Sequence, residues 1–174
     1  MKKLFSLLLA LALAVSLTAC GNGAAKEPFP EFEGVDFEGN AVGNEVFSRH
    51  NATVVNFWTN GCGACIAEMP DLETYCRQLK DRDINLIAVA VSAGDSDAMR
   101  ARAQDILESA NVTLTNVIPD PDSAFYRDFV CKITGFPATY VVDSAGNIIG
   151  EPILGALKNQ ESKLLELLET ALSE

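Results

Sequence analysis

The sequence predicts one α/β domain with a mixed central β-sheet flanked by helices. Apolar, strand-like runs alternate with helix-like periodic segments along most of the chain, which favours parallel strands joined by helices. The last two strand-like runs are joined by a turn signal, so part of the sheet is expected to be antiparallel. The 174 residues fit a single domain, and a hydrophobic fraction of 48% allows a core without disulfide staples.

The first residues are typical of an export signal. Two lysines precede an apolar run from Leu4 to Leu17, which is shorter than the roughly 20 residues of a membrane-spanning helix. The run ends in Leu-Thr-Ala-Cys-Gly, which resembles the lipobox of bacterial lipoproteins and implies cleavage before Cys20 and lipidation of Cys20. An ordinary secretory signal beside a free cysteine is the alternative. The chain is therefore divided into a lipoprotein signal peptide (1–19), a lipidated cysteine with a tether (20–31) and a folded domain (32–174).

The chain is acidic, with 13 Lys and Arg against 24 Asp and Glu and a net charge of −11. Removal of residues 1–19 takes away two lysines and no acidic residue, so the mature chain is more acidic still. Binding to nucleic acid and electrostatic adhesion to anionic lipid both need a surplus of basic residues. Nucleic acid is therefore excluded as a partner, and contact with the membrane is expected through the lipid on Cys20.

The first half of the domain contains four expected elements. Two turn signals between Phe32 and Asn40 predict a small N-terminal β-hairpin. The β-branched and aromatic run Thr53–Thr59 predicts a buried strand, and Ile84–Ser92 predicts a second one. Between them the apolar spacing changes to three and four residues. This spacing predicts a helix from Cys62 whose buried face is formed by Cys65, Met69, Leu72, Cys76 and Leu79.

The second half continues the alternation and closes with a hairpin. We expect a helix over 95–110, a strand over 113–118 and a short helix over 122–130. Strands over 139–143 and 148–154 flank the turn sequence Ser-Ala-Gly-Asn. An amphipathic helix over 159–173 ends the domain, with apolar positions that include Leu164, Leu165, Leu168 and Leu172.

Cys62 and Cys65 are the candidate reactive residues. The motif Cys-Gly-Ala-Cys follows a strand and opens a helix, so the helix dipole stabilises the Cys62 thiolate and lowers its pKa. Cys62 is then the attacking nucleophile, and Cys65, one turn further, closes a disulfide and releases the partner. Half of a zinc site and an inert structural disulfide are the alternatives. The first lacks further ligands at regular spacing, and the second gains little from so short a loop.

Pro137 is a second unusual residue, because proline is rare inside a sheet and here stands at the entrance of a strand. A cis Phe136–Pro137 bond would turn the chain and expose backbone groups beside the disulfide, where a substrate segment could pair as an added strand. A trans proline that begins the strand is the alternative, and the residues alone do not separate the two.

The stretch Asn56–Pro70, together with Ile133–Asp143, resembles the thioredoxin superfamily and, within it, the TlpA/ResA-like group of membrane-tethered thiol–disulfide oxidoreductases. The resemblance extends over residues 32–174. It implies a thioredoxin-like fold with an N-terminal β-hairpin and a helix–strand insertion at residues 95–118. It also implies a cis bond before Pro137.

The resemblance assigns further roles on the helix that carries the cysteines. Glu68 lies three residues after Cys65, where ResA-like proteins have an acid that lies near the active site and tunes the thiol pKa values. A solvated glutamate in the first helical turn is the alternative. Pro70 matches a proline that removes a backbone donor and bends this helix.

Substrate contacts are expected from Trp58, Gly61, Phe136 and Pro137. Gly61 stands where the family usually has tryptophan, which predicts a flatter or more open surface beside the nucleophile. Asn56 occupies the position of the buried aspartate of cytosolic thioredoxins, so the buried-acid mechanism of those proteins does not carry over.

Three residues are expected to have no part in the chemistry. Cys76 lies on the apolar helix face and is assigned to the core as an inert thiol. Cys131 is assigned to the core as well, and a Cys76–Cys131 disulfide is the alternative. His50, the single histidine of the chain, is expected at the surface.

The sequence thus predicts an extracytoplasmic protein disulfide reductase, lipid-anchored to the bacterial cell membrane, that acts by dithiol exchange through Cys62 and Cys65 without a metal or other cofactor. The resemblance implies exported proteins as substrates and an integral-membrane thiol protein as electron donor. The pathway would be cytochrome c maturation or a methionine sulfoxide reductase relay. A disulfide-donating oxidase, which differs in reduction potential, and a copper-delivery lipoprotein of related fold are the alternatives.

Overall fold

The computed structural model describes residues 26–173, so the predicted signal peptide, Cys20 and most of the tether lie outside the described part. Within it, nine strands form one mixed sheet in the order β1-β8-β7-β4-β5-β6-β2-β3, and β9 pairs with β7. The strands are β1 (Glu27–Pro28), β2 (Glu33–Val35), β3 (Ala41–Gly43), β4 (Ala52–Trp58), β5 (Ile84–Ala90), β6 (Asn116–Pro119), β7 (Ala138–Asp143), β8 (Asn147–Ile148) and β9 (Ile153–Leu154).

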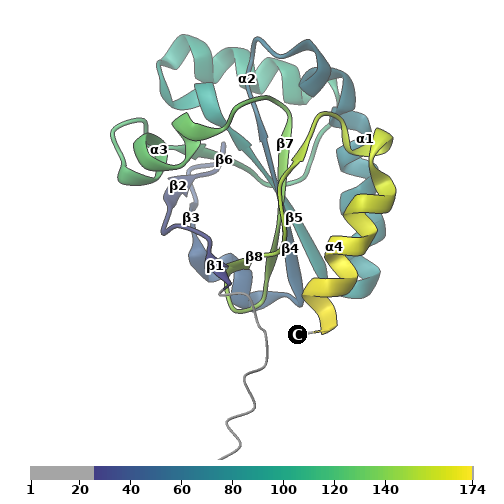
Figure 1. Ribbon diagram of the computed structural model, residues 1–174. Helices are drawn as coiled ribbons and strands as arrows, with labels where there is room; N and C mark the ends of the chain where they lie inside the picture. The colour runs from purple at the N-terminus through teal and green to yellow at the C-terminus, as the bar shows by residue number, and fades with distance from the viewer. Residues whose placement is uncertain (1–25, 174) are drawn as a thin grey trace, which may run out of the picture.

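Helices cover both faces of this sheet, as Figure 1 shows with α1 and α4 on one side and α3 beside β2 and β3 on the other. The α-helices are α1 (Gly63–Leu79), α2 (Asp97–Ser109), α3 (Ala124–Asp128) and α4 (Glu161–Ser173). Short 3-10 segments join them to the strands: η1 (Asn44–Arg49), η2 (Lys80–Arg82), η3 (Val91–Gly94), η4 (Val130–Lys132) and η5 (Leu157–Asn159).

β4 is the central strand, and all of its residues are buried. It pairs in parallel with β5 along its whole length and antiparallel with β7. Side chains alternate between two cores, because successive residues of a strand point to opposite faces. Val54 and Trp58 join residues of α1, α2 and α4, whereas Val55 and Phe57 join an aromatic core with η1 and α3.

Polar side chains at the helix starts explain where the helices begin. The Ser96 hydroxyl accepts a hydrogen bond from the Met99 N–H at the start of α2, and the Ser123 hydroxyl accepts one from the Tyr126 N–H at the start of α3. Each hydroxyl thereby satisfies a backbone donor that has no partner within the helix. The predicted helices and strands are found in the predicted order. The N-terminal hairpin is formed by β2 and β3.

The folded domain begins earlier than the predicted boundary at Phe32. β1 pairs with β8, and Phe29 is only 4% exposed. The Phe29 ring packs at 5.1 Å from the Phe47 ring and 5.3 Å from the Phe129 ring, measured between centroids. Burial of an aromatic side chain is a large gain, so residues 27–30 are held against the domain and are not part of a tether.

The predicted final strand over 148–154 is also wrong in detail, because it is split into β8 and β9. Gly150, between the two, has a φ of +62°, and Pro152 has no N–H with which to continue a ladder. In α4, Leu164 and Leu168 are buried as predicted, but Leu165 is 46% exposed. Across residues 26–173, no helix has the length and apolar character needed to cross a membrane.

Glu73 joins α1 to the segment that precedes β6. Its Oε2 accepts hydrogen bonds from the backbone N–H groups of Thr113 (2.8 Å) and Leu114 (3.0 Å), and its Oε1 accepts one from the Thr113 hydroxyl (2.9 Å). Burial acts to raise the pKa of Glu73, but these hydrogen bonds and the Arg77 guanidinium outweigh it and leave that pKa below its ordinary value. These bonds also occupy the N–H groups at 113 and 114, so the strand begins at Asn116 and not at 113.

Glu73→Gln is expected to lower the free energy of unfolding at pH 7 by about 1–3 kcal/mol, because the buried network loses its negative charge and one of its two acceptor oxygens. A carboxyl whose pKa is depressed by folding stabilises the protein above its ordinary pKa, and this contribution is lost as the pH falls through the depressed value. In urea denaturation, the free energy of unfolding of the variant should therefore differ from that of wild type by a large amount at pH 7 and by a small amount at pH 3. The exposed Glu166→Gln is the control, and an equal loss in both variants would contradict the assigned role.

Candidate functional site

Cys62 and Cys65 form a disulfide at the start of α1, just after the end of β4. Cys62 is the residue that caps α1, and its Sγ accepts a hydrogen bond from the Cys65 N–H at 3.1 Å. The two cysteines differ in accessibility, because Cys62 is half-buried whereas Cys65 is 1% exposed. A second protein can therefore contact Cys62 but not Cys65.

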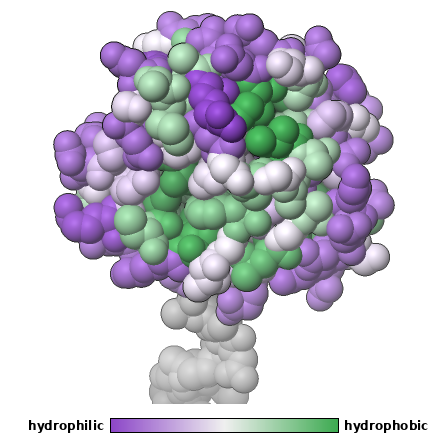
Figure 2. All heavy atoms as spheres, turned by 90° about the horizontal axis from the view of Figure 1, so that it is seen from above, coloured by the Kyte–Doolittle hydropathy of each residue, from purple (hydrophilic) through white to green (hydrophobic). Residues whose placement is uncertain are grey.

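Cys62 lies between two glycines, Gly61 and Gly63. Gly61 is exposed, and a Cβ added at Gly61, Gly63 or Gly135 would meet no atom within 4 Å. Figure 2 looks onto the end of the molecule where β4 and β5 finish, and apolar surface crosses the middle of this face between polar borders. The open surface predicted from Gly61 is thus present.

The Phe136–Pro137 bond is cis, as the resemblance implied. Ala138 lies opposite Phe57 in the pairing of β7 with β4, so Pro137 is level with the end of β4 that leads to Cys62. The Pro137 carbonyl accepts a hydrogen bond from the Gly155 N–H at 2.8 Å and is therefore occupied within the domain. Phe136, the residue before Pro137, is half-buried.

Glu68 lies in the interior, one turn after Cys65, with 1% of its surface exposed. Its Oε1 accepts a hydrogen bond from the Asn56 side-chain amide (3.1 Å), and its Oε2 accepts one from the backbone N–H of Leu157 (3.0 Å). Burial raises the pKa of Glu68 above its ordinary value, and the two hydrogen bonds only partly oppose that effect. The alternative of a solvated glutamate is therefore wrong.

Asn56 connects Glu68 to the sheet. Its amide nitrogen also donates to the Thr139 hydroxyl on β7 at 2.9 Å, in accordance with the pairing of residues 56 and 139 across β4 and β7. Asn56 was identified from the sequence, whereas Thr139 and the Leu157 N–H were not. Neither residue has a sequence signal, since each reaches Glu68 or Asn56 only through the tertiary fold.

Trp58 does not lie at the surface where a substrate contact was predicted. It is 0% exposed, and its indole N–H donates to the Asn116 side-chain oxygen at 2.9 Å. Strand alternation places Trp58 on the same face of β4 as Val54, beneath α1 and α2. Its role is to pack the core behind the disulfide loop.

Asn60 also positions the disulfide loop, although nothing in the sequence pattern indicates this role. It is 2% exposed, its N–H donates to the Ser92 hydroxyl (3.2 Å), and its amide donates to the Met99 carbonyl (2.8 Å). These bonds connect the loop before Cys62 to η3, which follows β5, and to the first turn of α2. The position of the nucleophile is therefore fixed by three elements and not by α1 alone.

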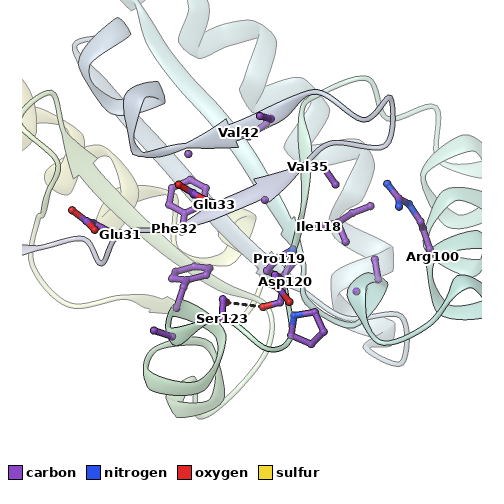
Figure 3. A pocket seen from close by; sticks show the side chains of 18 of the residues that line it. Glu31, Phe32, Glu33, Val35, Val42, Arg100, Ile118, Pro119, Asp120 and Ser123 are labelled. Carbon is purple, nitrogen blue, oxygen red and sulfur yellow. Dashed lines mark hydrogen bonds between the residues drawn. The ribbon is translucent and has the colours of Figure 1, made fainter.

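The first turn of α2 also borders a groove of about 1110 Å³. Figure 3 shows Val35 and Val42 of the hairpin on one side, Pro119 and Ser123 on the other, and Arg100 at one end. Its floor is apolar, and the acidic residues that line it are Glu31, Glu33, Glu45, Asp97 and Asp120. The groove thus adjoins α2, the helix to which Asn60 connects the loop before Cys62.

Residues 26–173 contain two further cysteines, and neither takes part in the disulfide. Cys76 is free and buried on α1, as predicted, and burial raises the pKa of its thiol. Cys131 is free and exposed, so both its assignment to the core and the alternative Cys76–Cys131 disulfide are wrong. The short η4 segment holds Val130 in the aromatic core and turns Cys131 outward. His50 is partly exposed, with its Nδ1 at 2.8 Å from Asp83 Oδ1.

Comparison with known proteins gives a family and a fold. The model of the family described as AhpC/TSA matches residues 25–150. The thiol-disulfide oxidoreductase ResA of Oceanobacillus iheyensis is 26% identical over 104 residues, which are 60% of this chain and 50% of that protein. The aligned region therefore spans half the length of that relative.

Solved structures of bacterial proteins superimpose on most of the chain. A putative thiol:disulfide interchange protein DsbE from Chlorobium tepidum has a TM-score of 0.66 and 20% identity, over 84% of this chain and 96% of that one. The thioredoxin domain of a thiol-disulfide oxidoreductase from Bacteroides vulgatus has a TM-score of 0.65 and 26% identity, over 81% and 97%. StoA from Bacillus subtilis has a TM-score of 0.58 and 19% identity, over 76% and 96%. The predicted thioredoxin-like fold and the resemblance to ResA-like proteins are thereby confirmed.

Proposed function

The chain belongs to the AhpC/TSA family, and we propose that it is an extracytoplasmic thiol–disulfide oxidoreductase that reduces disulfides of exported proteins through Cys62 and Cys65. The observation that carries this proposal is the disulfide itself, with a partly exposed cysteine at the cap of α1 and a buried cysteine one turn further. An inert structural disulfide has no need of a partly exposed cysteine at a helix N-terminus.

The proposed reaction begins with the reduced protein. The Cys62 thiolate, stabilised by the N-terminus of α1, attacks one sulfur of a substrate disulfide, and the other substrate sulfur leaves as a thiolate. The Cys65 thiolate then attacks the Cys62 sulfur of this mixed disulfide and expels the second substrate thiolate. The substrate gains two electrons and, after protonation, two thiols. Cys62 and Cys65 lose two electrons and form the disulfide present in the structure.

Glu68 is proposed to exchange a proton with Cys65. It lies three residues further along α1, a spacing that brings side chains onto the same helix face. Cys65 must become a thiolate to resolve the mixed disulfide, yet it is almost fully buried. A buried carboxyl whose pKa is raised can take up that proton where solvent has no access.

Substrate contacts are proposed for Gly61 and Phe136, whereas Pro137 is itself buried, so its proposed part is to position Phe136 beside the disulfide. The bare backbone at Gly61 lets a substrate chain approach the Cys62 sulfur closely. Since the Pro137 carbonyl is bound to Gly155, an added substrate strand would pair with the backbone at Phe136 instead.

The alternative function of copper delivery would need His50 and the Cys62–Cys65 pair to bind one ion. His50 precedes β4 and Cys62 follows it, and the seven-residue strand separates them by about 23 Å.

The proposed anchor is lipid on Cys20, with an integral-membrane thiol protein as electron donor and cytochrome c maturation or methionine sulfoxide reduction as the pathway. Residues 26–28 lie at the end of the sheet away from Cys62, where Lys26 forms an ion pair with Asp143 at 3.1 Å. The segment from Cys20 to Lys26 spans at most about 22 Å. This geometry would direct the disulfide away from the membrane, so an electron donor would need a domain that projects from the bilayer.

Insulin reduction in the presence of dithiothreitol tests the roles of the two cysteines. Cys62→Ser is expected to reduce the rate to that of dithiothreitol alone, because no nucleophile remains. Cys65→Ser is expected to accumulate a mixed disulfide with the substrate, visible on a non-reducing gel, because the resolving thiol is gone. Cys131→Ser is the control and should match wild type. Wild-type activity in Cys62→Ser would overturn the proposal.

Membrane fractionation of the expressed full chain tests the anchor. Wild type is expected in the membrane fraction, with a mass gain on the peptide that begins at Cys20. Cys20→Ala is expected in the soluble extracytoplasmic fraction or uncleaved, with the insulin activity of the folded domain unchanged. A Cys20→Ala protein that is processed and bound to the membrane like wild type would contradict lipid anchoring.

A further inference from the structure

Asn56 has an unusual hydrogen-bond pattern in the interior of the protein. It is 0% exposed, and its Nδ2 donates to both Glu68 Oε1 and the Thr139 hydroxyl. Its Oδ1, in contrast, is buried without a hydrogen-bond partner. An unpartnered buried carbonyl oxygen is unfavourable, and such an atom in a folded protein calls for an explanation.

The two neighbours of the amide nitrogen can accept a hydrogen bond in one state and donate one in another. The Thr139 hydroxyl is both a donor and an acceptor. A Glu68 carboxylate only accepts, but a protonated Glu68 donates. The Leu157 N–H already donates to Oε2, so an added proton belongs on Oε1, the oxygen that faces Asn56.

A half-turn of the Asn56 amide about its last side-chain bond exchanges the positions of its nitrogen and oxygen. The oxygen then accepts hydrogen bonds from a protonated Glu68 and from the Thr139 hydroxyl. Each orientation makes two hydrogen bonds in its own protonation state of Glu68 and leaves one amide atom unpartnered. The number of hydrogen bonds is therefore the same in the two states, and the proton on Glu68 decides which orientation is adopted.

We propose that Asn56 is a positioning residue whose side-chain amide turns over each time Glu68 gains or loses a proton. This inference rests on the proposed function, in which that proton comes from the Cys65 thiol. When the thiol gives up its proton, Cys65 becomes a thiolate, Glu68 becomes a neutral acid, and the Asn56 oxygen accepts the new O–H. When the proton returns, the amide turns back and donates to the carboxylate again.

The charged groups near Glu68 do not replace this contact. Asp71 of α1 and Lys158 of η5 act on the carboxyl in opposite directions, and the two form an ion pair at 3.1 Å. Tyr75 and Glu161 belong to the same surroundings on α1 and α4. The strands β4 and β7 contribute only the uncharged Asn56 and Thr139 to the hydrogen bonds of this site. When Glu68 takes up a proton, the group that changes its hydrogen bond to the carboxyl is therefore the Asn56 amide and not a neighbouring charged side chain.

A fixed amide and a turning amide predict different results for Asn56→Leu, which keeps the approximate size but makes no hydrogen bonds. A fixed donor supports only the carboxylate, so its loss would raise the pKa of Glu68 by about 1 pH unit or more. A turning amide supports both forms, so its loss should move that pKa by less than about 0.5 pH units. The pKa is measured from the ¹³C carboxyl resonance of Glu68 in the oxidised protein, where Cys62 and Cys65 do not titrate. A rise of about 1 pH unit or more overturns the proposal.

The wild-type protein supplies a second measurement that needs no Asn56 variant to fold. The Asn56 side-chain NH₂ resonances are expected to titrate with the same midpoint as Glu68 and to lose their contact with the Thr139 side chain at low pH. Glu68→Gln is the matched control, in which this pH dependence should vanish. NH₂ resonances that keep the Thr139 contact throughout the titration would overturn the proposal. Both measurements are independent of insulin reduction, so failure of the reductase proposal is recognised separately.

Discussion

The complete burial of β4 is the constraint on which both the fold and the candidate site depend. With β5 on one side and β7 on the other, this strand can neither slide nor turn without moving a row of paired residues. Its carboxyl end therefore delivers the chain to α1 in one position, where Cys62 becomes the helix cap. Its middle places Asn56 against Thr139 and within reach of Glu68. The same register thus sets the nucleophile and the proton-bearing network behind it.

Two glutamates of α1 illustrate how the surroundings of a side chain determine its role. Glu73 is held by three donated hydrogen bonds and a nearby guanidinium, and its pKa lies below the ordinary value. Glu68, five residues earlier, has two donated hydrogen bonds and deeper burial, and its pKa is raised. Glu73 therefore stabilises the fold at neutral pH. Glu68 opposes folding in its charged form, which is a cost expected at a functional site and not in an ordinary core.

Local sequence patterns predicted the features that depend on neighbouring residues. The three-and-four spacing after Cys62 identified the buried face of α1, and the β-branched run before it identified β4. The cis bond at Pro137 came only from the resemblance, because an isolated proline does not distinguish the two isomers. Phe29 was missed because its flanking prolines resemble a linker, while the rings that bury it lie in η1 and after α3.

Positions that depend on long-range contacts could not be predicted in this way. Trp58 was expected to contact substrate, but strand alternation turns it toward the core. The Leu157 N–H reaches Glu68 across 89 residues of sequence, and a backbone donor leaves no trace in residue identity. Cys131 follows a buried valine in a 3-10 segment too short to show a period.

Cys62 and Cys65 are proposed to form a reducing dithiol, and their reduction potential tests this role most directly. Cys131→Ser protein is equilibrated with graded ratios of reduced and oxidised glutathione or dithiothreitol, and the alkylated dithiol fraction is read by mass spectrometry. A reductase is expected to titrate between about −270 and −200 mV, the range of thioredoxin and the glutaredoxins. A potential near −120 mV, the value of the strong oxidant DsbA, would identify a disulfide donor and contradict the account.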